Sequence, residues 1–179
     1  MGATNLKQMI VAAMFAAIIA VSAQIMINIP PVPFTLLTIA VMLTGTILPI
    51  RYTMLAVLLY LAMGLVGVPV FAGMKAGPAV MVGPTGGYLM GLLPAALFIS
   101  TYLQFFKYSK LHAIIANCLG ALIILIVGAV WLKFIGNLSW DAALRSGLLL
   151  FVIPDLLKAI AAAFIGLTIR RRLKSLKMM

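Results

Sequence analysis

Residues 148–169 read LLLFVIPDLLKAIAAAFIGLTI, an apolar run long enough to cross a lipid bilayer as a helix. This run contains both Asp155 and Lys158, although the chain has only two acidic residues in total. At about 1.5 Å of rise per residue, Asp155 lies roughly 10 Å from the start of the run, and Lys158 lies roughly 18 Å from Arg170 beyond its end. Each ion near the bilayer centre costs about 2.5 to 3.5 kcal/mol. Because insertion does not require this cost, the pair is the first candidate for a functional site.

The composition predicts that the chain is an all-α integral membrane protein. Of its 179 residues, 65% are hydrophobic and only 8% are charged, which leaves too little polar surface to cover a globule in water. Hydropathy and the positions of glycine and proline predict six transmembrane helices, at residues 6–27, 34–49, 52–66, 88–106, 111–135 and 148–169. These segments use most of the length, so we expect residues 1–179 to form a single six-helix transmembrane domain.

The net charge of +11 is distributed as a topology signal. Alternate segment ends carry most of the cations, and the positive-inside rule assigns such ends to the cytoplasm. The cations at these ends are Lys7, Arg51, Lys107, Lys110, Arg170, Arg171, Arg172, Lys174 and Lys177, whereas the opposite ends carry only Lys75, Lys133 and Arg145. We therefore expect a multi-pass protein of the cell membrane with both termini cytoplasmic. A basic tail beside a span usually orients the protein or contacts the lipid bilayer, so no nucleic-acid partner is expected.

The inventory of reactive side chains argues against an enzyme. Paired-acid chemistry is disfavoured because one of the two carboxylates, Asp141, falls in a predicted outer loop. Cys118 is the only cysteine, and the sequence has neither a metal-binding cluster nor a phosphate-binding glycine motif. We therefore expect no metal and no cofactor, and any ATP-driven step would need a separate subunit.

Residues 64–87 interrupt the pattern of spans. They hold seven of the 15 glycines and three of the nine prolines, and Lys75 is their only charged residue. The glycines and prolines prevent a continuous helix, while interspersed valines and Phe71 disfavour full exposure to water. Irregular backbone at membrane depth is tolerated where it is buried in protein or lines a cavity. The sequence therefore predicts a re-entrant or capping loop between the third and fourth helices on the outer face, with an exposed hairpin as the alternative.

Two interpretations of Asp155 and Lys158 compete. Residues at i and i+3 face each other on a helix, so the pair can be a structural ion pair. A buried ion pair is weak evidence for stability, however, because desolvation can cancel the Coulomb gain. Retention in the membrane therefore favours a ligand contact or a charge relay. Pro154 frees a carbonyl one turn earlier and predicts a kink beside the pair.

Other polar and aromatic residues have simpler explanations from position alone. Tyr88, which follows two glycines, serves either a ligand or the interfacial aromatic belt, and the belt is favoured, as it is for Trp131. Thr35 and Thr38 lie on one side of the second predicted span, where such hydroxyls usually bond to their own helix. His112 has no partner cluster and is expected to be solvated.

The first predicted span carries small residues at helical spacing. Ala12 and Ala16 are four residues apart, and Ala13 and Ala17 lie on the adjoining ridge. Such residues let another membrane helix approach closely, and packing inside the chain competes evenly with a partner interface. The residues after Ala17 imitate a signal-peptide cleavage site, but the apolar run continues to residue 27, longer than the usual 7 to 15 or so residues. We therefore expect the segment to be kept as a span.

Four motifs, taken in order, resemble one known family. They are VPFT at residues 32–35, GVPVFAG at 67–73, GPTGGYLMG at 83–91 and DLLKA at 155–159. Together they resemble the BioY family, the biotin-specific S component of energy-coupling-factor (ECF) vitamin transporters, over nearly the whole chain. The resemblance implies a six-helix S-component fold and high-affinity capture of biotin from outside. It also implies a membrane T component and two ATP-binding-cassette ATPases as partners.

The resemblance also implies roles for individual residues. Asp155 and Lys158 match the family's biotin-contacting aspartate and lysine. We expect Asp155 to accept a ureido N–H, and Lys158 to donate either to the ureido oxygen or to a carboxylate, because of their donor and acceptor chemistry. The expected substrate-binding set is Asp155, Lys158, Tyr88, Thr85, Gly83, Thr35 and Lys75. The expected interface with the T component comprises Ala12, Ala13, Ala16 and Ala17.

The sequence departs from the family pattern at two places, and it leaves three alternative functions possible. Leu37 stands where the family commonly has glutamine, which removes a polar side chain from the second span. Ile153-Pro154 stands where the family commonly has Pro-Gly, and this difference affects the direction in which the Asp155 carboxylate points. An S component for another vitamin is the first alternative. A proton-coupled carrier that uses Asp155 as relay is the second, and a noncatalytic assembly subunit without a ligand is the third.

Overall fold

The computed structural model describes residues 3–176, which are mostly helical; Lys177 lies outside the described residues. Six longer helices follow the predicted order: α1 (Ala3–Gln24), α2 (Leu37–Ile47), α3 (Ile50–Leu65), α5 (Gly86–Phe105), α6 (Lys110–Ile135) and α8 (Leu150–Ser175). The shorter elements are strands β1 (Met26–Ile27) and β2 (Phe34–Thr35), helices α4 (Pro78–Met81) and α7 (Trp140–Leu144), and the π-helical turn η1 (Arg145–Leu149). The prediction of a helical membrane protein is confirmed.

The helices differ in their capacity to cross a bilayer. Within the described residues, four helical segments are long and apolar enough to do so: Asn5–Gln24, Gly86–Phe105, Lys110–Ile135 and the composite Trp140–Ser175. The remaining two predicted spans correspond to α2 and α3, which are apolar but only 11 and 16 residues long. At about 1.5 Å per residue, neither reaches the roughly 30 Å of a hydrocarbon core by itself.

The boundaries predicted between the first two spans were wrong. Residues that we assigned to the end of one helix and the start of the next form a two-stranded antiparallel hairpin, with Met26 opposite Thr35 and Ile27 opposite Phe34. The reason is local: Pro30, Pro31 and Pro33 lack the N–H that a helix needs. Hydropathy alone does not detect this change, because the strand residues Met26, Ile27 and Phe34 are themselves apolar.

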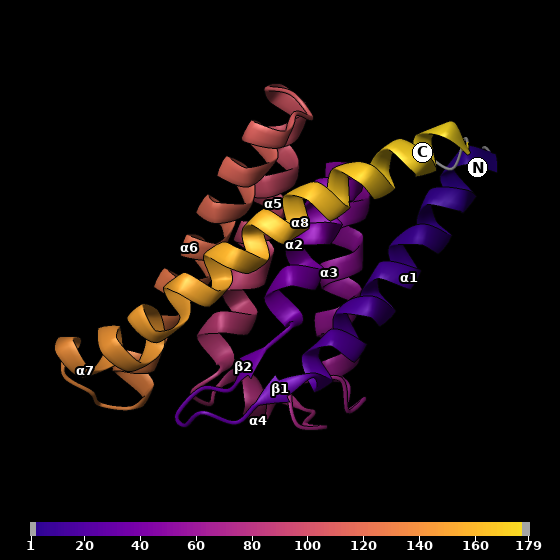
Figure 1. Ribbon diagram of the computed structural model, residues 1–179. Helices are drawn as coiled ribbons and strands as arrows, with labels where there is room; N and C mark the ends of the chain where they lie inside the picture. The colour runs from indigo at the N-terminus through magenta and orange to yellow at the C-terminus, as the bar shows by residue number, and fades with distance from the viewer. Residues whose placement is uncertain (1–2, 177–179) are drawn as a thin grey trace.

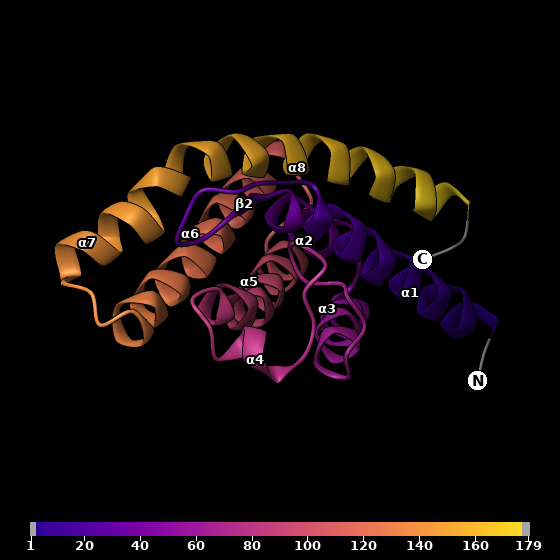
Figure 2. The ribbon, with the colours of Figure 1, turned by 90° about the horizontal axis from the view of Figure 1, so that it is seen from below.

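The elements sort to two ends of the molecule, as Figure 1 shows. The beginning of α1, the end of α8 and the connection between α5 and α6 lie at one end. The β1–β2 hairpin, α4 and α7 lie at the other, which we call the hairpin end. Figure 2, seen from the hairpin end, shows α7 and α8 arching across one side, with α4 on the other side next to α5. Both ends of the described chain thus lie at the end of the molecule opposite the hairpin (Figure 1).

The arch is built without a break at Pro154. Helix α8 continues through this residue, and the departure from α geometry lies just upstream, in the π-helical turn η1. Such turns are common near functional sites. Farther from the hairpin end, the buried Asn117 on α6 contacts both α2 and α8. Its Oδ1 lies 3.1 Å from the Thr46 hydroxyl on α2, and its Nδ2 donates to the Ala159 carbonyl on α8 over 3.4 Å.

Residues 64–87 fold against the protein rather than forming a free loop. Phe71 is only 1% exposed, and its ring lies against the backbone of Gly64, where an added Cβ would come within 2.1 Å of the ring. The same ring meets Tyr60 edge-on at a centroid distance of 5.8 Å. Short helix α4 follows Gly77, whose φ of +87° suits glycine. The segment is therefore anchored by one buried aromatic side chain, while much of its remainder stays at the surface.

Candidate functional site

A cavity opens at the hairpin end and holds about 750 Å³ of free space, its open mouth included. Its wall comes from the hairpin, α2, the 64–87 segment, α5, α6 and α8. Most of the wall is apolar: Val32, Phe34, Leu37, Phe71, Leu89, Leu92, Ile124, Leu125 and Phe151. A few polar residues interrupt it: Thr35, Thr38, Lys75, Thr85, Tyr88, Asp155 and Lys158. An apolar pocket with a small number of placed polar groups is typical of small-molecule sites.

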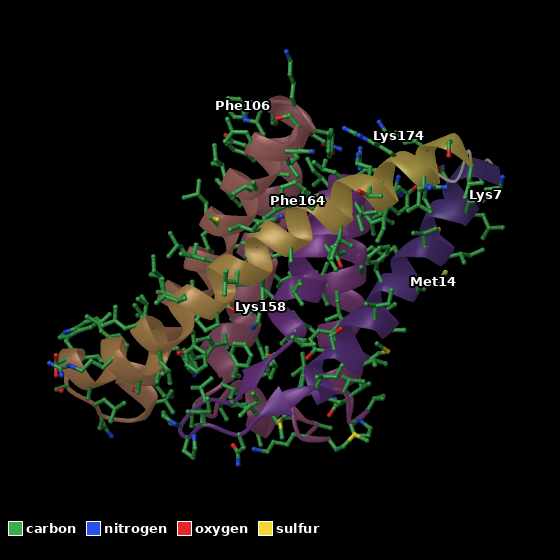
Figure 3. All side chains as sticks on the ribbon, viewed as in Figure 1. Lys7, Met14, Phe106, Lys158, Phe164 and Lys174 are labelled. Atoms are coloured by element: carbon green, nitrogen blue, oxygen red, sulfur yellow. The ribbon has the colours of Figure 1, made fainter. Side chains whose placement is uncertain are left out.

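Asp155 and Lys158 form a buried ion pair in this wall. Lys158 Nζ lies 2.8 Å from Asp155 Oδ1, and the two residues are 8% and 3% exposed. Lys158 also donates to the Thr35 carbonyl over 2.6 Å and to the Thr38 hydroxyl over 3.1 Å, which satisfies all three of its N–H donors. In Figure 3, Lys158 lies partway along α8, between the two ends of the molecule. The lysine thus ties α8 to the hairpin and to α2.

The carboxylate of Asp155 is held by one oxygen only. The Thr38 hydroxyl donates to Oδ1 over 3.1 Å, and Lys158 donates to the same atom. Within residues 3–176 no hydrogen bond engages Oδ2, although Asp155 lines the cavity. A carboxylate oxygen is a pure acceptor, so the pair presents an oriented acceptor to a donor that enters the cavity.

The expectation for Thr35 and Thr38 was wrong in its geometry. Thr35 lies in β2, and its hydroxyl accepts the N–H of Leu37 over 3.3 Å. Thr38 lies in the first turn of α2, and its hydroxyl donates to Asp155 instead of its own helix. Sequence reasoning missed Thr38 as a site residue, because the contact joins positions more than 100 residues apart. It also missed Phe34, whose ring centroid lies 3.8 Å from Lys158 Nζ.

Tyr88 lies in the cavity wall rather than in an outward-facing aromatic belt. Its hydroxyl donates to the Gly147 carbonyl in η1 over 2.6 Å. Its ring packs on Gly128, where an added Cβ would lie 2.3 Å from the ring, so only glycine permits this approach of α5 and α6. Tyr88 thereby joins α5, α6 and the arch beside the cavity. Thr85, just before α5, also lines the cavity.

Gly83 is a support rather than a wall residue. It is absent from the cavity lining, and its carbonyl accepts the indole N–H of Trp131 over 2.9 Å. The belt interpretation of Trp131 was therefore incomplete, because this side chain also anchors the segment before α5. His112 was expected to be solvated, yet it stacks on Phe106 and lies 3.3 Å from the Tyr102 hydroxyl through Nδ1.

Lys75 stands at the rim of the cavity. Its backbone pairs with that of Phe71 through two hydrogen bonds of 3.0 and 3.2 Å, while its side chain is exposed. Gln24, the last residue of α1, fixes the same segment: its side chain donates to the Val70 and Phe71 carbonyls and accepts the Met74 N–H, over 3.0 to 3.1 Å. Sequence reasoning missed Gln24, whose signal was an amide side chain at the end of an apolar span.

The four alanines of α1 divide into two pairs. Ala12 and Ala16 are 0% and 1% exposed and belong to the core of the chain. Ala13 and Ala17 are exposed. The inner pair therefore packs inside the chain, and the outer pair stays available at the surface. No group of three or more His, Cys, Asp or Glu side chains that could hold a metal ion occurs in the described part of the chain.

Comparison with known proteins relates this architecture to a family. The model of the BioY family matches residues 1–175. The chain belongs to the BioY family. Among the relatives of this BioY chain is Biotin transporter BioY2 of Lactococcus lactis subsp. cremoris (strain MG1363), with 43% identity over 170 residues that cover 95% of this chain and 93% of the relative. The Biotin transporter BioY of Thermotoga maritima is 39% identical over 166 residues, covering 93% and 97% of the two chains.

A solved structure matches this BioY chain in three dimensions. It is the crystal structure of the S-component for biotin from an ECF-type ABC transporter, with a TM-score of 0.85 and 29% sequence identity. The match covers 96% of this chain and 95% of the other. The chain therefore has the S-component fold of a multi-pass membrane protein. Members of the BioY family are transporter S components and not enzymes.

Proposed function

We propose that the chain binds biotin from the outer side of the cell membrane and imports it as the substrate-specific component of an ECF-type transporter. The observation that carries the proposal is the oriented carboxylate of Asp155, with one oxygen free toward an apolar cavity. The names of the relatives, biotin transporters, support the choice of ligand. The S-component fold supports the class of transporter.

The chemistry of biotin matches the distribution of groups in the cavity. Its ureido ring offers N–H donors, and Asp155 Oδ2 is an acceptor of the kind they need. Its fused rings and alkyl tail are apolar and suit walls such as Phe34, Leu92 and Phe151. Lys158 neutralises Asp155 and fixes its direction, because its three donors bind Asp155, Thr38 and the Thr35 carbonyl. Tyr88, Thr85 and Thr35 complete the proposed binding wall, and Gly83 holds the segment before α5 in place through Trp131.

The proposal places the hairpin end outside and both termini in the cytoplasm. In Figure 3, Lys7 and Lys174 lie toward the same end as Phe106, away from the hairpin. Most basic residues of the described chain belong to that end by their position in the helices and turns. Cytoplasmic loops are rich in lysine and arginine, which supports this orientation.

Import would need a membrane T component and two ATP-binding-cassette ATPases, since the sequence has no motif for ATP binding. Ala13 and Ala17 form the proposed docking face on α1. They are exposed and four residues apart, and their neighbours Met14 and Ile18 are 56% and 44% exposed. Small residues at this spacing let a partner helix approach the backbone closely.

The direct test is to express the chain alone, purify it in lipid nanodiscs and identify the bound small molecule by mass spectrometry. Biotin is the expected ligand, with displacement by added unlabelled biotin. Recovery of a different vitamin would overturn the choice of ligand but keep the class of protein. Absence of any ligand, together with no binding of added biotin, would favour an assembly subunit and overturn the proposal.

A further inference from the structure

Three cations lie toward the hairpin end, and two of them already have partners. Arg145 pairs with Asp141 over 2.8 Å. The ammonium of Lys133 lies 4.5 Å from the ring centroid of Phe134 and 5.3 Å from that of Trp140. Lys75 has no ion pair, side-chain hydrogen bond or aromatic partner among the described residues. It is also the one of the three that lines the cavity.

The other cation of the cavity wall cannot serve a second anion without losing a contact. Lys158 uses its three donors on Asp155, Thr38 and the Thr35 carbonyl, and it is 8% exposed. The charges of Asp155 and Lys158 cancel. Lys75 therefore gives the cavity lining a net positive charge, which a monoanionic ligand would balance.

The backbone at Lys75 is held in place although its side chain is exposed. Two backbone hydrogen bonds pair it with Phe71, whose ring is buried against Gly64 and Tyr60. Gln24 clamps the same segment from α1 through Val70, Phe71 and Met74. A flexible lysine side chain on an anchored backbone suits a ligand whose anionic group lies at the mouth of the cavity. There, water still solvates both the ammonium and the anion.

We infer that Lys75 binds the carboxylate at the end of the ligand's alkyl tail and selects the free acid over neutral derivatives. The inference rests on the proposed function, which places the ureido ring at Asp155. A carboxylate placed at that inner end would meet the Asp155 charge, so the acid end belongs at the rim. There, Lys75 supplies the opposite charge and an N–H donor.

The test compares biotin with biotin amide, which has the same rings and tail but no charge. Competition against labelled biotin is measured on the purified chain in nanodiscs of neutral lipid. The wild type is expected to prefer the free acid. Lys75→Gln is expected to weaken biotin binding about five- to tenfold, between the value of an exposed ion pair and that of a shielded charged hydrogen bond. Binding of the amide should change less than about twofold, which also shows that the variant folds.

Lys133→Gln is the matched control, because it removes one positive charge toward the same end but outside the cavity. It should leave the ratio of acid to amide affinity at the wild-type value, and Lys75→Arg should retain most of the preference. An unchanged preference in Lys75→Gln, or equal losses in the two glutamine variants, would overturn the role of Lys75. A wild type that binds neither compound would instead overturn the proposed function.

Discussion

At the scale of single residues, the hydrogen bonds around the Asp155–Lys158 pair offset part of the free-energy cost of burying its two charges. Burying two charges is expensive, and the expense falls when every donor of the lysine has an acceptor. Thr38 and the Thr35 carbonyl supply the two acceptors that Asp155 does not. What remains unused inside the described chain is Asp155 Oδ2, the atom that our proposal gives to the ligand.

Asp155→Asn should therefore reduce biotin affinity about tenfold to a hundredfold, because a hydrogen bond to a charged acceptor contributes about 1.5–3 kcal/mol. Isothermal titration of the purified chain measures the change. Asp141→Asn is the matched control, since it removes the other carboxylate from an exposed pair with Arg145 and should leave affinity within about twofold. Equal affinities for wild type and Asp155→Asn would exclude Asp155 from the site.

A double substitution separates a ligand site from a structural ion pair. Lys158→Met leaves Asp155 charged and unpaired in the wall, so it should lower unfolding stability by about 3–5 kcal/mol. Asp155→Leu combined with Lys158→Met replaces the pair with apolar groups and should recover most of that stability. The double variant should nevertheless fail to bind biotin. Thermal unfolding and biotin titration are measured on the wild type, Lys158→Met and the double variant. A double variant that still binds biotin would identify the pair as structural.

At the scale of elements, hydropathy predicted the six apolar helices but not the structure between them. The hairpin of residues 26–35 replaced two predicted helix ends, because three closely spaced prolines outweigh apolar composition there. Residues 64–87 were recognised as irregular from their glycines and prolines. The partners of their anchors were not predicted: Phe71 packs on Gly64, and the Gln24 side chain donates to the Val70 carbonyl, 46 residues away in sequence.

In the candidate site too, contacts between residues far apart in the sequence could not be predicted. Asp155 and Lys158 stood out because charge is rare in an apolar span. Tyr88, Thr85, Thr35 and Lys75 came from the family resemblance, and the structure brings all four to the cavity wall with Asp155. Thr38 looked like an ordinary helix hydroxyl, and its contact with Asp155 appears only when α2 and α8 are packed together.

Helix α1 carries a prediction of its own, because adjacent alanines face different surroundings. Ala13→Trp and Ala17→Trp should block assembly with the T component while leaving biotin affinity unchanged, since both residues are exposed. Ala12→Trp should damage both properties, because Ala12 is fully buried. Co-purification with the T component and biotin titration are measured in parallel. Leu97→Trp, on an exposed position of α5, is the control that should preserve both. Assembly that survives the Ala13 and Ala17 variants would place the docking face elsewhere.

At the scale of the whole molecule, the candidate site and most of the basic residues lie at opposite ends. The hairpin and the 64–87 segment lie at the hairpin end (Figure 1) and contribute residues to the cavity wall. Most basic residues of the described chain instead belong to the end where α1 begins and α8 ends. Helix α8 runs from the hairpin side toward the opposite end and carries Asp155 and Lys158; Lys158 lies partway along it (Figure 3). In our proposal, ligand capture uses the hairpin end, and the exposed Ala13 and Ala17 on α1 are left for a partner.

This division predicts that binding and transport are separable. Reconstituted in liposomes, the chain alone should bind biotin but accumulate none, because our proposal assigns the ATP-driven step to separate subunits. Addition of the T component, the ATPases and ATP should start uptake, and collapse of the proton gradient should leave that uptake unchanged. Concentrative uptake by the chain alone that stops with the gradient would instead support the proton-coupled carrier. In that case Asp155→Asn would abolish the coupling, because its carboxylate is the one acidic group in the cavity wall within the described residues.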